Sequence, residues 1–364
     1  MNKDLLLVMY GDKPKSMVEN VLQEANILRD IPNKSSLIGI KPNLVLAQPA
    51  ELGATSSPDL VEGVIIYLKS KGYNNIIILE GSWVGDRTPL AFEICGYQEL
   101  SQKYKIPLVD LQKDTYRDYR VEESTLYICD KAMEVDYLIN IPVLKGHCQT
   151  RITCALKNMK GCIPDKEKRR FHTMGLHKPI AYLSKALRQD LIIVDGIIGD
   201  LNFEEGGNPV QMNRIILGKD PVLVDSYVAQ LLGYDISEIP YIEMAAALGI
   251  GSCQLTDKNI RELNKDTSPM TIPKTRLVQQ LANHIEENMA CSACYGSLIH
   301  ALDRLKDRKG LHKINEKIYI GQGFKDIKGQ GIGVGICTKG FEKNLPGCPP
   351  KAKDILEFLL QSLE

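Results

Sequence analysis

Short apolar runs alternate with amphipathic stretches along the first 250 residues of the chain. The runs occupy residues 5–9, 36–40, 75–79, 106–109, 137–144, 191–194 and 214–218. Continuous apolar character of this length is typical of strands that are buried on both faces of a parallel sheet. Between the runs, residues 16–28 carry apolar side chains at helical spacing, and Ser57-Pro58-Asp59 is a helix-start signal. The alternation predicts an α/β fold with a doubly wound, mostly parallel sheet.

Further helices are expected at 89–104, from Asp220-Pro221 to Gly233, and at 240–248. The intervening stretch 145–177 is the most polar and least regular part of the chain, and we interpret it as a cationic loop. Its three cysteines match no metal-ligand spacing and are expected to be buried structural thiols. These are Cys148, Cys154 and Cys162.

Polar residues follow five of the predicted strands. They are Lys41-Pro42-Asn43, Glu80-Gly81-Ser82, Asp110, Lys145-Gly146-His147 and Asp195-Gly196. In an open α/β sheet, ligands bind beyond the carboxyl ends of the strands. We therefore expect a crevice that holds a small anionic substrate, because several ammonium groups in one cleft repel unless an anion lies among them. Its expected ligand-binding residues are Lys41, Asn43, Lys157 and Asn158.

Catalytic roles in this crevice are assigned to His147 and Lys145, since a histidine can exchange a proton near neutral pH. The alternative is that each lysine is solvated or pairs with a nearby acid such as Glu80 or Asp195. The cationic stretch after Lys145 is equally explained as a solvated surface loop.

Four of the ten cysteines lie in the last fifth of the chain, at Cys291, Cys294, Cys337 and Cys348, and Pro349 follows the last of them. Four thiolates complete either a tetrahedral zinc site or the ligand set of an iron–sulfur cube. A zinc ribbon usually has two Cys-x2-Cys pairs, whereas this segment has one pair and two distant single cysteines. The pattern favours a [4Fe–4S] cluster, with zinc as the alternative.

The amino-acid composition and the lengths of the apolar runs limit which classes of function are expected. The 364 residues are 44% hydrophobic and 25% charged, with 45 basic and 45 acidic side chains. A balanced charge does not predict binding to nucleic acid or to an anionic membrane. The N-terminal apolar run is too short for a signal sequence and no run approaches a bilayer span, so the protein is expected to be cytoplasmic with reduced thiols. We expect a main domain at 1–257, a linker at 258–280 and a cluster-binding domain at 281–364.

Several segments resemble the domain of unknown function family 362 over about residues 4–251. They are Lys41-Pro42-Asn43, the Glu80-Gly81-Ser82 turn with Phe92, Gly96 and Tyr97, Lys145-Gly146-His147, Lys157-Asn158-Met159-Lys160-Gly161 and Val224-Asp225. The resemblance implies this fold and an iron–sulfur module, but no reaction. The cysteine spacing, ending on Gly347-Cys348-Pro349-Pro350, instead resembles the proximal [4Fe–4S] site of hydrogenase small subunits and of a related subunit of respiratory complex I.

The sequence therefore favours an iron–sulfur oxidoreductase or electron-transfer protein, with a ferredoxin-like electron donor as an expected partner. One alternative is a non-redox binding protein or metallo-chaperone in which a zinc or cluster module is structural. Another is a cluster-assisted lyase or isomerase. The chain has no nucleophile elbow, P-loop or paired acids on one helix face, which argues against a hydrolase or a kinase.

Overall fold

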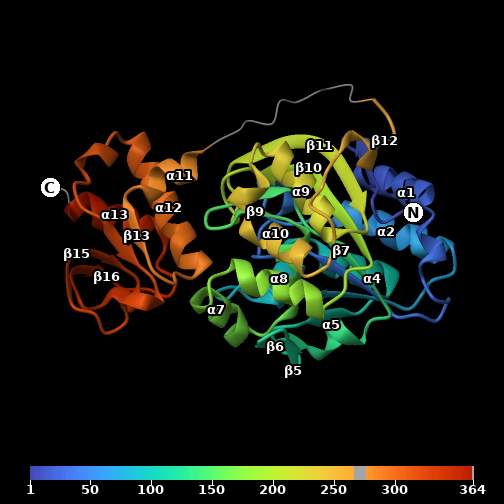
Figure 1. Ribbon diagram of the computed structural model, residues 1–364, viewed down its shortest axis with the longest axis horizontal. Coiled ribbons are helices and arrows are strands. Elements are labelled where there is room, and N and C mark those ends of the chain that lie inside the picture. Colours follow the sequence, from blue (N-terminus) through green and yellow to red (C-terminus); the bar gives the residue numbers. More distant parts are fainter. Residues whose placement is uncertain (266–275, 363–364) are drawn as a thin grey trace. The chain divides into compact units, whose positions relative to one another are not determined.

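The computed structural model describes residues 1–265 and 276–362, and the chain divides into two compact units (Figure 1). Unit 1 comprises Met1–Lys168 and His177–Lys274, and unit 2 comprises Arg169–Leu176 and Thr275–Glu364. Each unit is built around its own sheet.

Unit 1 is organised around an eight-stranded sheet in the order β12-β1-β11-β10-β7-β2-β3-β4. Its strands are β1 (Leu6–Tyr10), β2 (Ile38–Pro42), β3 (Ile76–Glu80), β4 (Leu108–Asp110), β7 (Tyr137–Ile141), β10 (Leu191–Asp200), β11 (Pro209–Gly218) and β12 (Ile260–Glu262). Among these strands, β11 alone runs antiparallel to its neighbours. The predicted doubly wound, mostly parallel α/β class is confirmed.

Helices cover both faces of this sheet because its strands are apolar on both sides. One core contains Ile38 and Ile40 of β2 together with side chains of the helices α1 (Pro14–Ala25), α2 (Pro58–Ser70), α3 (Thr88–Ile94) and α4 (Tyr97–Tyr104). The other face carries α6 (Ala155–Asn158), α8 (His177–Ala186), α9 (Pro221–Leu231) and α10 (Pro240–Ala247), which contact one another (Figure 1). Burial of these aliphatic side chains is the main stabilising term, at about 1.5–3 kcal/mol for each.

The expected helix at 89–104 is two helices, since Gly96 adopts a left-handed φ of 78° between α3 and α4. A β-hairpin of β5 (Tyr116–Val121) and β6 (Ser124–Cys129), followed by α5 (Asp130–Glu134), was not expected. The strand β5 carries charged side chains at exposed positions, so its apolar pattern is weak.

The interpretation of 145–177 as a loop is wrong. This stretch forms β8 (Lys145–His147) and β9 (Arg151–Thr153), then α6, a 3-10 turn and α7 (Asp165–Thr173), and it reaches the first residue of α8. Seven of the nine residues of α7 are charged or histidine, which hides the helical period in the sequence.

Part of the expected linker at 258–280 is ordered. Residues Ile260–Glu262 form β12, which pairs with β1 at the edge of the sheet, and Leu277–Ala282 form α11. The central part of that range, 266–275, lies outside the described residues.

Unit 2 contains a four-stranded sheet in the order β13-β14-β15-β16, and all its pairings are parallel. The strands are β13 (Ile285–Glu287), β14 (Ile318–Ile320), β15 (Gly329–Val334) and β16 (Phe341–Leu345). Successive strands from β14 onward are joined by short 3-10 turns, whereas α12 (Ser292–Asp307) lies between β13 and β14. α12 packs against the C-terminal helix α13 (Ala352–Ser362) (Figure 1). The smaller C-terminal α/β segment expected from the sequence is therefore present.

Across residues 1–265 and 276–362, no helix combines the length and the apolar character that a bilayer span requires.

The start of α9 depends on a buried carboxylate. Asp220 accepts hydrogen bonds from the backbone N–H groups of Val222 (2.8 Å), Leu223 (3.0 Å) and Ser252 (2.8 Å). We expect Asp220→Ala to lower the free energy of unfolding by about 2 kcal/mol, because a helix cap is lost and buried donors are left unpaired. Denaturant unfolding followed by fluorescence of Trp83, the single tryptophan, measures this change. The exposed Asp59 is the matched control, and an equal loss for Asp59→Ala would contradict the prediction.

Candidate functional site

The carboxyl ends of β2 and β3 carry a buried ion pair. Lys41 Nζ lies 2.7 Å from Glu80 Oε1 and 2.8 Å from Glu80 Oε2, and it also donates to the carbonyl of Pro42 at 2.8 Å. Glu80 accepts a further hydrogen bond from the N–H of Leu44. Both side chains are buried, so Lys41 pairs with the nearby acid that the sequence suggested as an alternative.

Gly161 lies directly against this ion pair. A Cβ atom at Gly161 would be 2.1 Å from Glu80 Oε1 and 2.6 Å from Lys41 Nζ. Neither atom can move without breaking the buried pair, so only glycine fits. This contact explains the glycine that closes the segment Lys157–Gly161.

Lys145 is held by three oxygen acceptors. Its ammonium group donates to the carbonyl oxygens of Ala54 (2.6 Å) and Glu204 (2.8 Å) and to Asn43 Oδ1 (3.3 Å). Burial lowers the pKa of Lys145 to about 8. Because the three acceptors match the three N–H donors of an ammonium, the arrangement favours the charged form.

Glu204 joins two of the predicted residues. Its Oε1 accepts from Lys157 Nζ at 2.6 Å, and its Oε2 lies 2.7 Å from His147 Nε2. Burial acts to raise the pKa of Glu204, but His147 and Lys157 outweigh it and hold the pKa well below the usual range. The carboxylate is therefore ionised.

The ring of His147 is held in one tautomer. Nδ1 accepts the backbone N–H groups of Gln149 and Thr150, both at 3.0 Å, so the neutral ring carries its proton on Nε2, facing Glu204. Burial lowers the pKa of His147 to about 4. Charging the ring would require a proton on Nδ1 and would break both backbone hydrogen bonds.

These residues form two hydrogen-bonded groups, which we together call the buried charge cluster: Lys41 with Glu80, and Lys145, His147 and Lys157 with Glu204. Asn43 joins it through Lys145, and Asn158 Nδ2 lies 3.4 Å from the carbonyl of Pro42 and donates to Asn140 at 2.7 Å. The structure places all six residues expected in the crevice in or beside these two groups, with Lys41 and Asn158 both donating to the carbonyl of Pro42. That they bind an anion and that His147 and Lys145 are catalytic stay predictions.

Sequence reasoning missed Glu204. It lies between β10 and the antiparallel β11, so the rule about carboxyl ends of parallel strands does not point to it. One sequence signal could have identified it. Glu204 and Glu205 form an acidic pair directly before Gly206-Gly207, and the lysines expected in the crevice need acidic partners.

Two aspartates beside the sheet are buried. Asp225 is fully buried and accepts the N–H groups of Ala155 (2.7 Å) and Leu156 (3.2 Å) at the start of α6. Burial raises the pKa of Asp225 to about 7 and that of Asp195 to about 6. Asp195 accepts the N–H of Ser57 at 2.7 Å and anchors the start of α2, so it is not the partner of Lys41.

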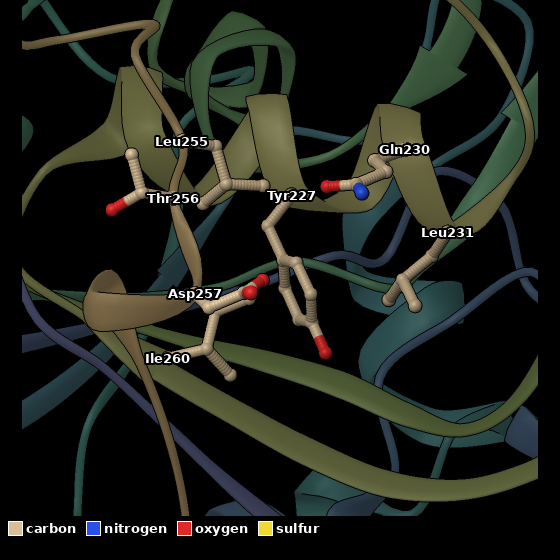
Figure 2. A pocket seen from close by; sticks show the side chains of 7 residues that line it. All are labelled: Tyr227, Gln230, Leu231, Leu255, Thr256, Asp257 and Ile260. Atoms are coloured by element: carbon tan, nitrogen blue, oxygen red, sulfur yellow. The ribbon is translucent and has the colours of Figure 1, made fainter.

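A hollow of about 310 Å³ lies between α9 and the segment before β12 (Figure 2). Tyr227, Gln230 and Leu231 line one side of it, and residues 255–257 with Ile260 line the other. None of the residues expected in the crevice lines this hollow, so it is separate from the buried charge cluster.

In unit 2, the cysteines follow the carboxyl ends of parallel strands. Cys291 and Cys294 come after β13, Cys337 after β15, and Cys348 after β16. Because these strands run in the same direction in one sheet, the three cysteine segments meet at one edge. Backbone hydrogen bonds join two of these segments, those of Cys337 and Cys348: Gly335 N–H donates to Leu345 O at 2.8 Å, and Ile336 N–H donates to Gly347 O at 3.1 Å.

The thiols are close enough to influence one another. The pKa of Cys294 is raised by burial and further by Cys291, Cys348 and Cys337. Within the described part of the chain, no group of three or more His, Cys, Asp or Glu side chains is arranged so that it could hold a metal ion. The cysteine segments thus lie at one edge of the sheet, whereas the four thiols as one ligand set, and the metal that they would hold, stay predictions.

Two glycines shape the cysteine loops. Gly335 and Gly347 adopt φ values of 95° and 151°, and a Cβ at Gly347 would meet Pro350 Cα at 2.5 Å. The close turn at Gly347 sets the direction in which Cys348 leaves β16. By contrast, Cys148, Cys154 and Cys162 of unit 1 are buried, as expected of structural thiols.

Comparisons with known proteins agree with the family resemblance. Residues 38–230, more than half of the chain, match the family described as Domain of unknown function (DUF362). A thylakoid-associated protein of Synechocystis sp. is 27% identical over 218 residues, which are 58% of this chain and 67% of that protein. The lactate racemase apoprotein from Thermoanaerobacterium thermosaccharolyticum superposes with a TM-score of 0.43 at 14% identity. That superposition covers 66% of this chain and 59% of the racemase, so the chain spans less than two thirds of it.

The pKa of His147 predicts a specific pH dependence. Folding depresses it from 6.5 to about 4, so its contribution to stability is present above pH 6.5 and is lost as pH falls towards 4. We expect the free energy of unfolding, followed by Trp83 fluorescence, to fall by about 3 kcal/mol over this range on account of His147. His147→Gln should remove this component, whereas the exposed His312→Gln should retain it. Ring ¹⁵N shifts showing His147 protonated at pH 6 would contradict the prediction.

The Lys41–Glu80 pair predicts a charge-compensation effect. Lys41→Met leaves a buried carboxylate without its cation, and we expect a loss of about 3–5 kcal/mol in the free energy of unfolding. Adding Glu80→Gln should recover part of this loss, because the amide is neutral and still accepts the N–H of Leu44. Lys131→Met, which breaks the exposed pair with Glu134, is the control and should cost less than about 1 kcal/mol. Equal effects of the two single substitutions would refute the role of burial.

Proposed function

This chain belongs to the DUF362 family of domains of unknown function, and we propose that it is an iron–sulfur protein that transfers single electrons. In this proposal Cys291, Cys294, Cys337 and Cys348 of unit 2 hold a [4Fe–4S] cluster. The observation that carries the proposal is the meeting of three cysteine segments at one edge of a parallel sheet. A lone Cys-x2-Cys pair would be ambiguous, but four thiols gathered from distant positions are the complete ligand set of such a cluster.

The chemistry of the donor set fits this group. Burial and the neighbouring thiols Cys291, Cys348 and Cys337 raise the pKa of Cys294, and thiolates form readily when a cationic centre compensates their charge. The bound group would supply a one-electron couple. The protein's own contribution would be to fix the positions of the four thiolates. The turns at Gly335 and Gly347 would let the backbone pass close to them.

The alternative of a zinc site uses the same four cysteines. Thiolate ligands suit both metals, and the single Cys-x2-Cys pair with two distant cysteines favours the cluster. A zinc-loaded protein would be the binding protein or metallo-chaperone considered from the sequence, and metal analysis separates the two outcomes.

We further propose that the buried charge cluster of unit 1 is the site for a small anionic substrate. Lys157 and His147 both contact the carboxylate of Glu204, which supports the idea that this position suits an anion. A substrate carboxylate would exchange with Glu204, and the loop at 201–208 that carries Glu204 would have to move. His147 would then present its Nε2–H to the substrate, with Lys145 holding the surrounding backbone.

One observation favours a second candidate, a lyase or isomerase. The ionised carboxylate of Glu204 lies 2.7 Å from the Nε2–H of His147, and a carboxylate held beside a hydrogen-bond donor can accept a proton from a substrate without a change of redox state. A redox titration distinguishes the two candidates, because only the electron-transfer protein needs a cluster that is reduced and reoxidised during turnover.

The cluster assignment predicts the result of anaerobic purification. The intact chain should contain about four iron and four sulfide per protein, as the proposed cluster requires, with absorbance near 400 nm. Cys294→Ala should lose most of the iron, because it removes one of four thiolate ligands. Cys253→Ala, a cysteine outside the set, should keep it. Unchanged iron content in single variants of all four cysteines would refute the assignment, and stoichiometric zinc without sulfide would favour the structural zinc module.

A further inference from the structure

A second polar hollow, of about 230 Å³, lies at the opposite edge of the unit 1 sheet from the buried charge cluster. Lys3 precedes β1, Gln189 precedes β10, and Lys219 follows the antiparallel β11. These positions are all at the amino-terminal edge of the parallel strands, whereas Lys41 and Glu80 are at the carboxyl-terminal edge. We call this site the basic hollow, and the side chains that matter here are Lys3, Ser184, Lys185, Arg188, Gln189 and Lys219.

Two buried donors in the basic hollow lack a partner. The hydroxyl of Ser184 and the Nε2 of Gln189 have no hydrogen-bond partner among the described residues, and Ser184 is only 7% exposed. Buried polar groups are nearly always satisfied, so two such donors in one hollow indicate an absent acceptor.

The orientation of the Gln189 amide is set by its neighbours. Its Oε1 accepts from Asn140 Nδ2 at 2.6 Å, and Asn140 Oδ1 in turn accepts from Asn158 Nδ2 at 2.7 Å. Because Asn140 presents a donor, the Gln189 oxygen must face it. The Gln189 NH2 group therefore belongs on the side of the hollow.

The cations around the hollow are only partly compensated. Lys219 pairs with Asp30 at 2.9 Å, and Arg188 pairs with Asp190 at 3.3 Å. The nearby Asp220 is used by backbone N–H groups at the start of α9.

Lys3 and Lys185 instead donate to the carbonyl oxygens of Ile250 (3.0 Å) and Leu248 (2.8 Å). Each of these contacts uses one of the three N–H bonds of an ammonium group, and neither supplies a negative charge. N–H donors of Lys3 and Lys185 therefore remain available in the hollow. Its positive charge also exceeds what the acidic residues Asp30 and Asp190 balance.

We propose that the basic hollow binds the phosphoryl group of a small, soluble phosphorylated compound. The side chains around it offer a hydroxyl, an amide NH2, ammonium groups and a guanidinium, and such a set of donors fits a ligand that only accepts. A phosphoryl group has several acceptor oxygens and up to two negative charges, so it can use the neutral donors Ser184 and Gln189 and the cations together. The site goes beyond the cluster chemistry and does not depend on it.

The test is a calorimetric titration of the full-length protein with inorganic phosphate and with pyrophosphate, at constant ionic strength. We expect saturable binding. Ser184→Ala should weaken it about tenfold, as loss of one hydrogen bond to a charged group does. Gln189→Glu should abolish binding, because the carboxylate still accepts from Asn140 but replaces a donor by a negative charge. Lys185→Gln should weaken binding, whereas Lys131→Gln, which removes the same charge from α5, should leave it within about twofold.

Three outcomes would overturn the proposal. The first is the absence of saturable binding of either probe at millimolar concentration. The second is an equal loss for Lys131→Gln and Lys185→Gln, which would indicate general charge attraction. The third is binding only to vesicles that contain anionic phospholipid, with no response to free phosphate or pyrophosphate, which would indicate a lipid surface instead of a soluble ligand. Unfolding curves that match the wild type show that the Ser184 and Gln189 variants are folded.

Discussion

Parallel pairing of strands is the constraint on which both candidate sites depend. When strands run in the same direction, their carboxyl ends share one edge of the sheet, and residues far apart in the chain meet there. In unit 1 this brings Lys41 to Glu80 across β2 and β3. In unit 2 it gathers the segments of Cys291, Cys337 and Cys348. The amino ends of the parallel strands share the opposite edge of the unit 1 sheet, and Gln189 and Lys3 lie there, in the basic hollow.

The charges in unit 1 are buried only because each one has partners. Lys41 is held by Glu80, Lys157 by Glu204, and Lys145 by three neutral oxygens. An unpaired charge in such a place costs several kcal/mol, so these contacts limit which residues the neighbouring backbone can carry. Gly161 illustrates the limit, since any side chain there would displace the Lys41–Glu80 pair. Removing one partner from such a cluster would leave the other charge buried without compensation, which destabilises the fold.

The two units offer ligands of different chemical character. Unit 2 presents soft thiols on glycine-shaped loops, which suit a transition metal or a cluster. Unit 1 presents ammonium, amide and imidazole groups, which suit oxyanions. This division is consistent with a protein in which one unit holds a redox group and the other holds a substrate.

The sequence by itself determined seven of the eight strands of the unit 1 sheet and the helices α1, α2, α9 and α10, because continuous apolar runs and caps such as Asp220 act locally. It also determined which polar residues follow which strands, since that depends only on where each run ends. Tertiary structure decided the partner of each buried charge: Glu204 comes from a loop beside an antiparallel strand, and Asp225 turns inward to bind the start of α6. It also decided that 145–177 forms two short strands and the helices α6 and α7 instead of a loop. The physical reason is that the spacing of apolar residues depends on how one segment packs against the core. The position of a buried charged side chain depends instead on the distant segment that supplies the opposite charge.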